Sequence, residues 1–147
     1  MRVIPLIPAM LWAMLMLLAF GLPPAELPGR TFFNFPGASV LVHFVLFTIL
    51  AILLAWGFYK RRMLRKADFF LKNHLTGILL PAAILGSAYG LLTELMQFMF
   101  FHARQGSWLD VGINFFGTIF GLILFTVIVH FCSRSGPKDK PSAGNRN

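Results

Sequence analysis

Acidic side chains are the first residues to suggest chemistry, because this sequence of 147 residues holds only five of them. Two, Glu94 and Asp110, lie within or beside long apolar stretches. A carboxylate in lipid is costly unless it is protonated, partnered or in contact with water, so an acid at such a position indicates a functional site. There it could act as a general base, carry a proton or bind a ligand.

Further polar residues follow both acids at helical spacing, since residues three or four positions apart lie on one face of a helix. The stripe around the first acid contains Gly86, Gly90, Glu94 and Gln97. The stripe on the next apolar segment contains Asp110, Asn114, Gly117 and Gly121. The predicted binding residues are His43, Glu94, Gln97, Arg104, Asp110 and Asn114, with Glu94, Asp110 and His43 as candidate catalytic groups.

Each of these residues also has a structural interpretation. Asp110 follows a serine by three positions, which is the spacing of a capping box at a helix start. Asn114 and Gln97 could join neighbouring helices through hydrogen bonds worth about 0.6–2 kcal/mol each. His43 could be a satisfied interfacial histidine, and Arg104 could reach a lipid phosphate.

Signatures of soluble enzymes are absent from the sequence. It has no Gly-rich phosphate loop, no paired-cysteine motif, no two-histidine metalloprotease helix and no nucleophile elbow. No spacing of histidines and acids demands a metal, so we expect neither a metal nor a cofactor. A metal site made from His43, His102, Glu94 and Asp110 is the alternative.

Composition indicates which elements position these residues. The chain is 57% hydrophobic and 12% charged, whereas a soluble domain is about 25% charged. A hydrocarbon layer of roughly 30 Å needs about 20 apolar residues in a helix, and four segments qualify. We therefore predict an all-α integral membrane protein with an antiparallel bundle of four transmembrane helices in residues 1–132, at about 3–22, 40–58, 75–101 and 109–131.

Local signals refine these segments. Ser39 is the expected N-cap of the second helix, and Pro81 interrupts the third, which is long enough to tilt or kink. The first segment could instead be a cleaved signal peptide. Because its basic region is a single Arg2 and Pro23-Pro24-Ala25-Glu26 is a poor cleavage site, we expect a retained helix.

The third and fourth helices should be antiparallel neighbours, because only a short loop separates them. Gly86-x-x-x-Gly90 and Gly117-x-x-x-Gly121 are small-xxx-small patterns that permit close helix approach. The polar residues of these two helices should therefore face each other at a similar depth.

Basic residues predict the orientation. Eleven of the 13 lysines and arginines lie on one side of a four-span topology, and only Arg30 and Arg104 lie on the other. Because lysine and arginine accumulate in cytoplasmic loops, both termini and the connector 59–74 should be cytoplasmic, and the polar residues should face outward from the cell membrane. This arrangement accounts for the net charge of +8 without nucleic-acid binding.

Two basic segments flank the predicted spans on the cytoplasmic side. The connector 59–74 either lies on the inner leaflet and attracts anionic lipids or forms a solvated loop. Residues 133–147 are rich in Ser, Gly, Pro and Lys, which is typical of a disordered tail.

The polar residues of this chain resemble the signature of the VanZ-like family in their order, which is Glu94-x-x-Gln97, Arg104, Asp110-x-x-x-Asn114-x-x-Gly117-x-x-x-Gly121. His43-Phe44 is similar to that family's other recurrent feature. The resemblance covers about residues 40–124. An Asp-Lys pair often precedes the histidine in the family, whereas this chain has Ser39-Val40. The resemblance implies a small bacterial cytoplasmic-membrane protein of the cell envelope. The family's namesake is associated with low-level resistance to the glycopeptide antibiotic teicoplanin.

Residues and resemblance together predict a protein that binds an envelope component at an outward polar site. A lipid-linked head group or a glycopeptide is the expected ligand, and the lipid bilayer, with anionic lipids at its inner face, is the expected surrounding. One alternative is an intramembrane enzyme that acts on an envelope lipid with Glu94 and Asp110 as acid–base groups. A small proton-coupled carrier and a scaffold are the others.

Overall fold

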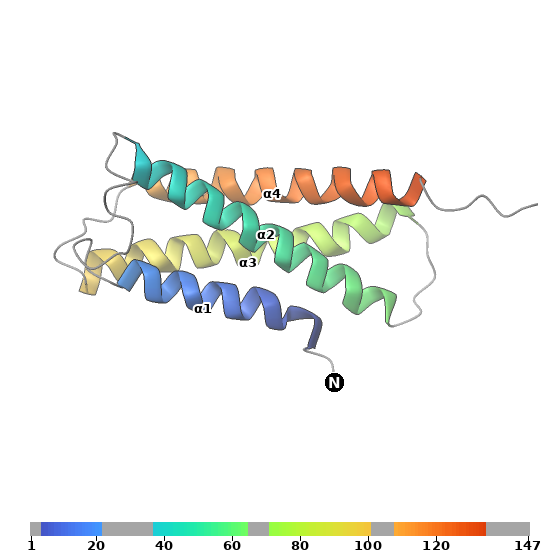
Figure 1. Cartoon of the computed structure of the whole chain (residues 1–147), viewed down its shortest axis with the longest axis horizontal. Helices are drawn as coiled ribbons and strands as arrows, with labels where there is room; N and C mark the ends of the chain where they lie inside the picture. The colour runs from blue at the N-terminus through green and yellow to red at the C-terminus, as the bar shows by residue number, and fades with distance from the viewer. Residues whose placement is uncertain (1–3, 22–36, 65–70, 101–107, 135–147) are drawn as a thin grey trace, which may run out of the picture.

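The computed structural model describes residues 4–21, 37–64, 71–100 and 108–134, and all secondary structure in these ranges is helical. A short 3-10 helix (Ile4–Leu6) leads into α1 (Ile7–Gly21), which is followed by α2 (Ala38–Met63), α3 (Leu71–Phe100) and α4 (Trp108–Arg134). Figure 1 shows four helices side by side, each antiparallel to the next. The predicted all-α fold is confirmed for the described residues.

Three of the helices are long and apolar enough to cross a membrane. The corresponding stretches are Ala38–Met63, Leu75–Met99 and Trp108–Cys132. The first helix is shorter: α1 has 15 residues and therefore spans about 22 Å. With the 3-10 turn it forms the apolar helix Ile4–Phe20, shorter than the predicted first span.

The start of α2 differs from the prediction. The helix begins after Gly37, whose φ of 89° lies in the left-handed region that glycine tolerates. The Leu41 amide donates to the Gly37 carbonyl oxygen at 3.0 Å, and no side chain caps this end. The predicted N-cap at Ser39 is wrong, because a glycine turn starts the helix two residues earlier and Ser39 lies in its first turn.

The long helices also extend into the predicted connector 59–74. α2 continues to Met63 and α3 begins at Leu71, so the described part of this connector is mostly helical. The last turn of α2 carries Lys60, Arg61 and Arg62, where the helix dipole favours positive charge. α3 is a single helix with Pro81 inside it. The predicted disordered tail 133–147 starts too early, because α4 continues through Ser133 to Arg134. Residues 65–70 and 135–147 lie outside the described residues.

The interior contains two apolar clusters. One consists of Ala51, Ala55, Ile78, Ala82, Leu122 and Phe125 and joins α2, α3 and α4. The other consists of Met16, Phe20, Phe47 and Leu50 and joins α1 to α2. Two hydrogen bonds fix α1 further: Trp12 Nε1 donates to the Leu46 carbonyl at 3.1 Å, and the Tyr89 hydroxyl donates to the Ala13 carbonyl.

Glycines set the spacing between helices. A Cβ at Gly117 would lie 2.7 Å from the Phe44 carbonyl oxygen, and one at Gly121 would lie 2.5 Å from the Thr48 carbonyl oxygen. The backbones of α2 and α4 are therefore in contact along this stripe. Gly86 and Gly90 of α3 face α4 instead, where added Cβ atoms would lie 2.8 Å from Thr118 Cγ2 and 3.0 Å from Asn114 Cβ.

The outer surface of the bundle is apolar on every helix. Exposed large residues include Met10, Leu11 and Leu18 on α1, Leu41 and Val45 on α2, Leu91, Leu95 and Phe98 on α3, and Phe116, Phe120 and Ile123 on α4. Water would not wet such a continuous surface, but lipid tails would cover it. The described helices therefore have the surface of a membrane protein.

Candidate functional site

Four predicted site residues meet at one end of the bundle. They are His43 from α2, Glu94 from α3, and Asp110 and Asn114 from α4, and we call them the polar cluster. His43 is the sixth residue of α2, Asn114 is the seventh of α4, and Glu94 is the seventh from the end of α3. Each lies about 8–9 Å from its helix end. Because these three ends lie together in Figure 1, the side chains meet at one depth.

The centre of the polar cluster is shielded from the exterior. The exposed fractions are 1% for His43, 4% for Glu94 and 1% for Asn114, while Asp110, in the first turn of α4, is half-buried. A carboxylate buried this deeply requires partners that offset its lost hydration.

Hydrogen bonds provide those partners and define the orientation of each group. Asn114 Nδ2 donates to Glu94 Oε1 at 3.3 Å, and Asn114 Oδ1 lies 3.0 Å from His43 Nδ1. Because the Asn114 amide nitrogen is directed at the Glu94 carboxylate, the Asn114 amide oxygen faces the His43 imidazole. This oxygen can only accept a hydrogen bond. The His43 tautomer that fits has its proton on Nδ1, donating to Asn114.

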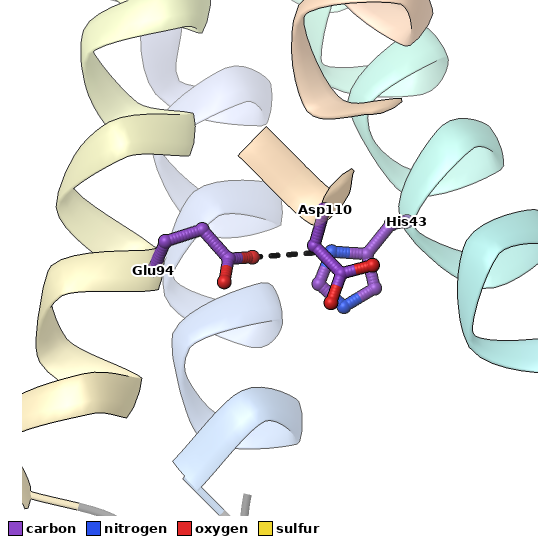
Figure 2. A group of neighbouring side chains, drawn as sticks. All are labelled: His43, Glu94 and Asp110. Carbon is purple, nitrogen blue, oxygen red and sulfur yellow. Dashed lines mark ion pairs between the residues drawn. The ribbon is translucent and has the colours of Figure 1, made fainter. Parts of the chain in front are cut away.

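Two carboxylates flank this histidine. Glu94 Oε1 lies 3.6 Å from His43 Nδ1, the contact drawn as a dashed line in Figure 2, and the two form an ion pair only when the ring is protonated. Asp110 enters from α4, and one ligand atom from each of His43, Glu94 and Asp110 lies within 4.8 Å of the other two. An acid–base pair and a second acid therefore share one small volume.

Apolar and hydroxyl side chains surround the polar cluster. Phe20 of α1 stacks on the His43 ring, with centroids 4.8 Å apart and planes inclined by 23°. Thr93 and Thr118 are buried nearby, and their hydroxyls donate to carbonyl oxygens of their own helices, at Gly90 and Asn114. Both hydroxyls are therefore occupied within their own helices, and the burial of the cluster makes electrostatic interactions inside it stronger than in water.

Gln97 lies on the next turn of α3 beyond Glu94, toward the end of the helix. Its side chain is 2% exposed, and within the described part of the chain its Nε2 has no hydrogen-bond acceptor. A buried amide donor without an acceptor costs about 1–3 kcal/mol. This donor is therefore suited to an oxygen-bearing ligand at the end of the bundle.

Other predicted residues lie elsewhere. Arg104, the serine before α4 and His102 fall outside the described residues. Gly86 and Gly90 contact the α4 side of the site, while Gly117 and Gly121 contact α2. Phe20 was not among the predicted residues, because α1 is apolar on all sides and its sequence has no periodicity that identifies the buried face.

A separate groove lies between α3 and α4 near their other ends. It has a volume of about 540 Å³ and is lined by Leu75, Thr76, Leu79, Leu80, Ala83, Ile119, Leu122, Ile123, Thr126 and Val127. It holds no titratable side chain and shares no residue with the polar cluster. A lipid-facing groove of this composition is typical of contact with acyl chains.

No family model, no curated protein and no solved structure matches the chain.

Proposed function

We propose that this chain is a four-span VanZ-like protein of the bacterial cell membrane, with both termini inside, which binds a polar envelope component at the outward end of the bundle. The observation that carries the proposal is the buried Glu94 carboxylate, held by Asn114 at 3.3 Å and His43 at 3.6 Å. Packing alone would not require an acid at this position, because an amide or an apolar residue would be less costly in lipid.

Two further observations support the proposed orientation. The polar cluster lies at the start of α2, whereas Lys60, Arg61 and Arg62 occupy its last turn, at the opposite end of the bundle. Basic residues accumulate on the cytoplasmic side of membrane proteins. The polar cluster would then open toward the outside, where envelope components are found.

The charges of the cluster favour a certain class of ligand. Two carboxylates attract ammonium, hydroxyl and amide groups, while Gln97 offers a donor to a carbonyl or hydroxyl oxygen. A lipid-linked head group with sugar and peptide parts, or a glycopeptide such as teicoplanin, presents these groups. Its lipid part would remain in the bilayer beside the apolar outer surface of the bundle.

Mass spectrometry of material that co-purifies with the chain in native lipid tests this proposal. We expect one envelope lipid to be enriched at least about tenfold over the bulk membrane, a preference of about 1.4 kcal/mol. Asn114→Leu should abolish the enrichment, because it removes both hydrogen bonds at the centre of the cluster. His130→Gln is the matched control, since this exposed histidine lies near the other end of α4, away from both the cluster and the groove.

A lipid profile identical to that of the bulk membrane, together with no calorimetric binding of teicoplanin, would overturn the binding proposal. Loss of the enriched lipid in His130→Gln would equally contradict the assigned location, because that residue lies near the other end of α4.

The proximity of His43 and Glu94 favours an intramembrane enzyme as the second candidate. With 3.6 Å between Nδ1 and Oε1, the two groups can exchange a proton and could serve as a general acid and base. Incubation of the purified chain with its enriched lipid separates the two functions. A new product that disappears in Glu94→Gln, while the lipid still binds, indicates an enzyme, and an unchanged lipid indicates a binding protein.

A further inference from the structure

We propose that His43, Glu94 and Asp110 form a binding site for one divalent transition-metal ion, with Zn²⁺ as the best match. The three residues come from α2, α3 and α4, and one ligand atom of each lies within 4.8 Å of the others (Figure 2). Imidazole nitrogen and carboxylate oxygen are the ligands that Zn²⁺ combines in protein sites. This inference goes beyond ligand binding at the bundle end and does not depend on it.

The distances at the centre of the cluster fit a small cation. Donor atoms at about 2.0–2.1 Å from a tetrahedral Zn²⁺ are about 3.3 Å apart. His43 Nδ1 lies 3.6 Å from Glu94 Oε1 and 3.0 Å from Asn114 Oδ1, so the observed separations lie on either side of that value. The Asn114 carbonyl oxygen is therefore placed to act as an additional oxygen ligand.

Asp110 completes the set with a modest adjustment. One ligand atom from each of the three residues lies within 4.8 Å of the others, so the widest separation exceeds the tetrahedral value by at most about 1.5 Å. Asp110 is half-buried in the first turn of α4, so its side chain has room to rotate. His43 and Glu94 need little movement, because each is already held by Asn114.

Charge balance favours a dication at this position. In the metal-bound form both carboxylates would be ionised and the imidazole neutral, and a divalent ion would offset the charge of these ligands. Coordination through Nδ1 requires the tautomer whose proton is on Nε2, and a neutral ring reaches it without net proton release. When the metal binds, the Asn114 carbonyl oxygen loses its N–H donor on His43 and contacts the cation instead. A carbonyl dipole also stabilises a cation.

Gln97 supplies an independent observation that points to a ligand at the same site. Its buried Nε2 has no acceptor in the described ranges, and it lies on the next turn of α3 beyond Glu94. Gln97 is the fourth residue from the end of α3 and Asp110 is the third of α4, so the two lie at a similar level of the bundle. A water or hydroxide bound to the metal would provide the acceptor that this donor lacks.

Metal titration of the full chain in detergent tests the site. After treatment with EDTA and dialysis, we expect one Zn²⁺ per chain by mass spectrometry of the bound metal and by calorimetry. Co²⁺ should give the intense visible absorption of a tetrahedral complex. His43→Gln, Glu94→Gln and Asp110→Asn should each weaken binding at least about tenfold, since each replaces an imidazole or carboxylate by a neutral amide, a weaker ligand for Zn²⁺.

His130→Gln is the matched control, because this histidine lies near the other end of α4 and should leave Zn²⁺ affinity unchanged. Asp110→Asn is the decisive variant if the buried substitutions do not fold, because Asp110 is only half-buried. Circular dichroism and gel filtration check folding. A Zn²⁺ affinity that is unchanged by Asp110→Asn, or no Zn²⁺ binding by a well-folded wild-type chain, would overturn the proposal.

The metal titration uses the stripped protein without any envelope lipid, so its result is separate from that of lipid co-purification. A chain that binds Zn²⁺ but enriches no lipid refutes only the proposed function. A chain that enriches a lipid without binding Zn²⁺ refutes only the metal site.

Discussion

At the scale of single residues, Glu94 is the group whose chemistry is least explained by packing. Its Oε1 accepts from Asn114 and lies 3.6 Å from His43, in a site that is 4% exposed. An amide could accept the same hydrogen bond, so the contact with Asn114 does not by itself require the carboxylate charge. Either proton exchange or cation binding would require it.

Glu94→Gln separates these roles. The substitution keeps the size and one carbonyl acceptor for Asn114 but removes the charge and the exchangeable proton. We expect normal folding, with about 1 kcal/mol or less lost from stability, and complete loss of function in a deletion strain. Immunoblots of the membrane fraction check insertion. Full complementation by this variant would leave the scaffold alternative as the better explanation.

Asn114 should be the most sensitive position for stability. Asn114→Leu keeps approximately the volume but leaves the buried Glu94 and His43 groups without their amide partner. Each unsatisfied buried group costs about 1–3 kcal/mol, so the thermal midpoint in detergent should fall by several degrees. Thr118→Val, which removes a hydroxyl bonded within its own helix, should change it much less. Equal midpoints for wild type and Asn114→Leu would contradict the observed network.

Sequence reasoning reached part of this site. An acid and an amide with helical spacing on adjacent apolar segments predicted that Glu94 and Asn114 face each other, and the structure brings them to 3.3 Å. The stacking of Phe20 on His43 was not predictable, because any large side chain on a uniformly apolar helix is equally consistent with the sequence. The unsatisfied Gln97 nitrogen also emerges only from three-dimensional packing.

At the scale of helices, the glycine stripe of α4 determines how closely α2 and α4 pack. A Cβ at Gly121 would meet the Thr48 carbonyl oxygen at 2.5 Å and Ala51 Cβ at 2.9 Å, neither of which belongs to a flexible side chain. At Gly112 on the same helix, an added Cβ would have no neighbour within 4 Å. This pair of glycines provides an internal comparison.

Gly121→Ala should therefore destabilise the bundle, and Gly112→Ala should not. The first substitution separates two backbones and weakens the contacts beside it, at a cost of about 1–3 kcal/mol for overpacking. The second only improves helix propensity, by up to about 1 kcal/mol. Thermal melting of both variants in the same detergent measures the difference. A Gly121→Ala chain as stable as Gly112→Ala would show that α2 and α4 are not in close contact.

Which helix a glycine stripe approaches was not readable from the sequence. The small-xxx-small pattern predicts close contact but not the partner, and Gly117 and Gly121 contact α2, whereas Gly86 and Gly90 contact α4. The largest difference from the predicted helix ends is at α2, which continues to Met63 instead of ending at about 58. Its start was predicted to within two residues, but a glycine turn replaces the expected serine cap there. A hydropathy pattern does not indicate where a residue such as Gly37 adopts a left-handed backbone conformation.

At the scale of the whole molecule, the separation of charge along the bundle predicts its orientation. The basic last turn of α2 and the polar cluster lie at opposite ends. Alkaline phosphatase, which is active only outside the cytoplasm, should be active when fused after Arg30 or Arg104 and inactive after Lys66 or Lys140. The opposite pattern would place the polar cluster on the cytoplasmic side and exclude an external ligand.

The distribution of the polar cluster over three helices has a consequence for biosynthesis. Helices enter the bilayer in order as the chain emerges from the ribosome, and an acid within a span whose hydrogen bonds are incomplete opposes this step by a few kcal/mol. His43 of α2 precedes α3, so the contact that is still missing is the one with Asn114. Glu94 of α3 receives its Asn114 hydrogen bond only after α4 has arrived. We therefore expect α3 to wait at the insertion machinery until α4 is synthesised, so that the two helices enter lipid as a hairpin. The residues that complete the site would then also set the order in which the protein is assembled in the membrane.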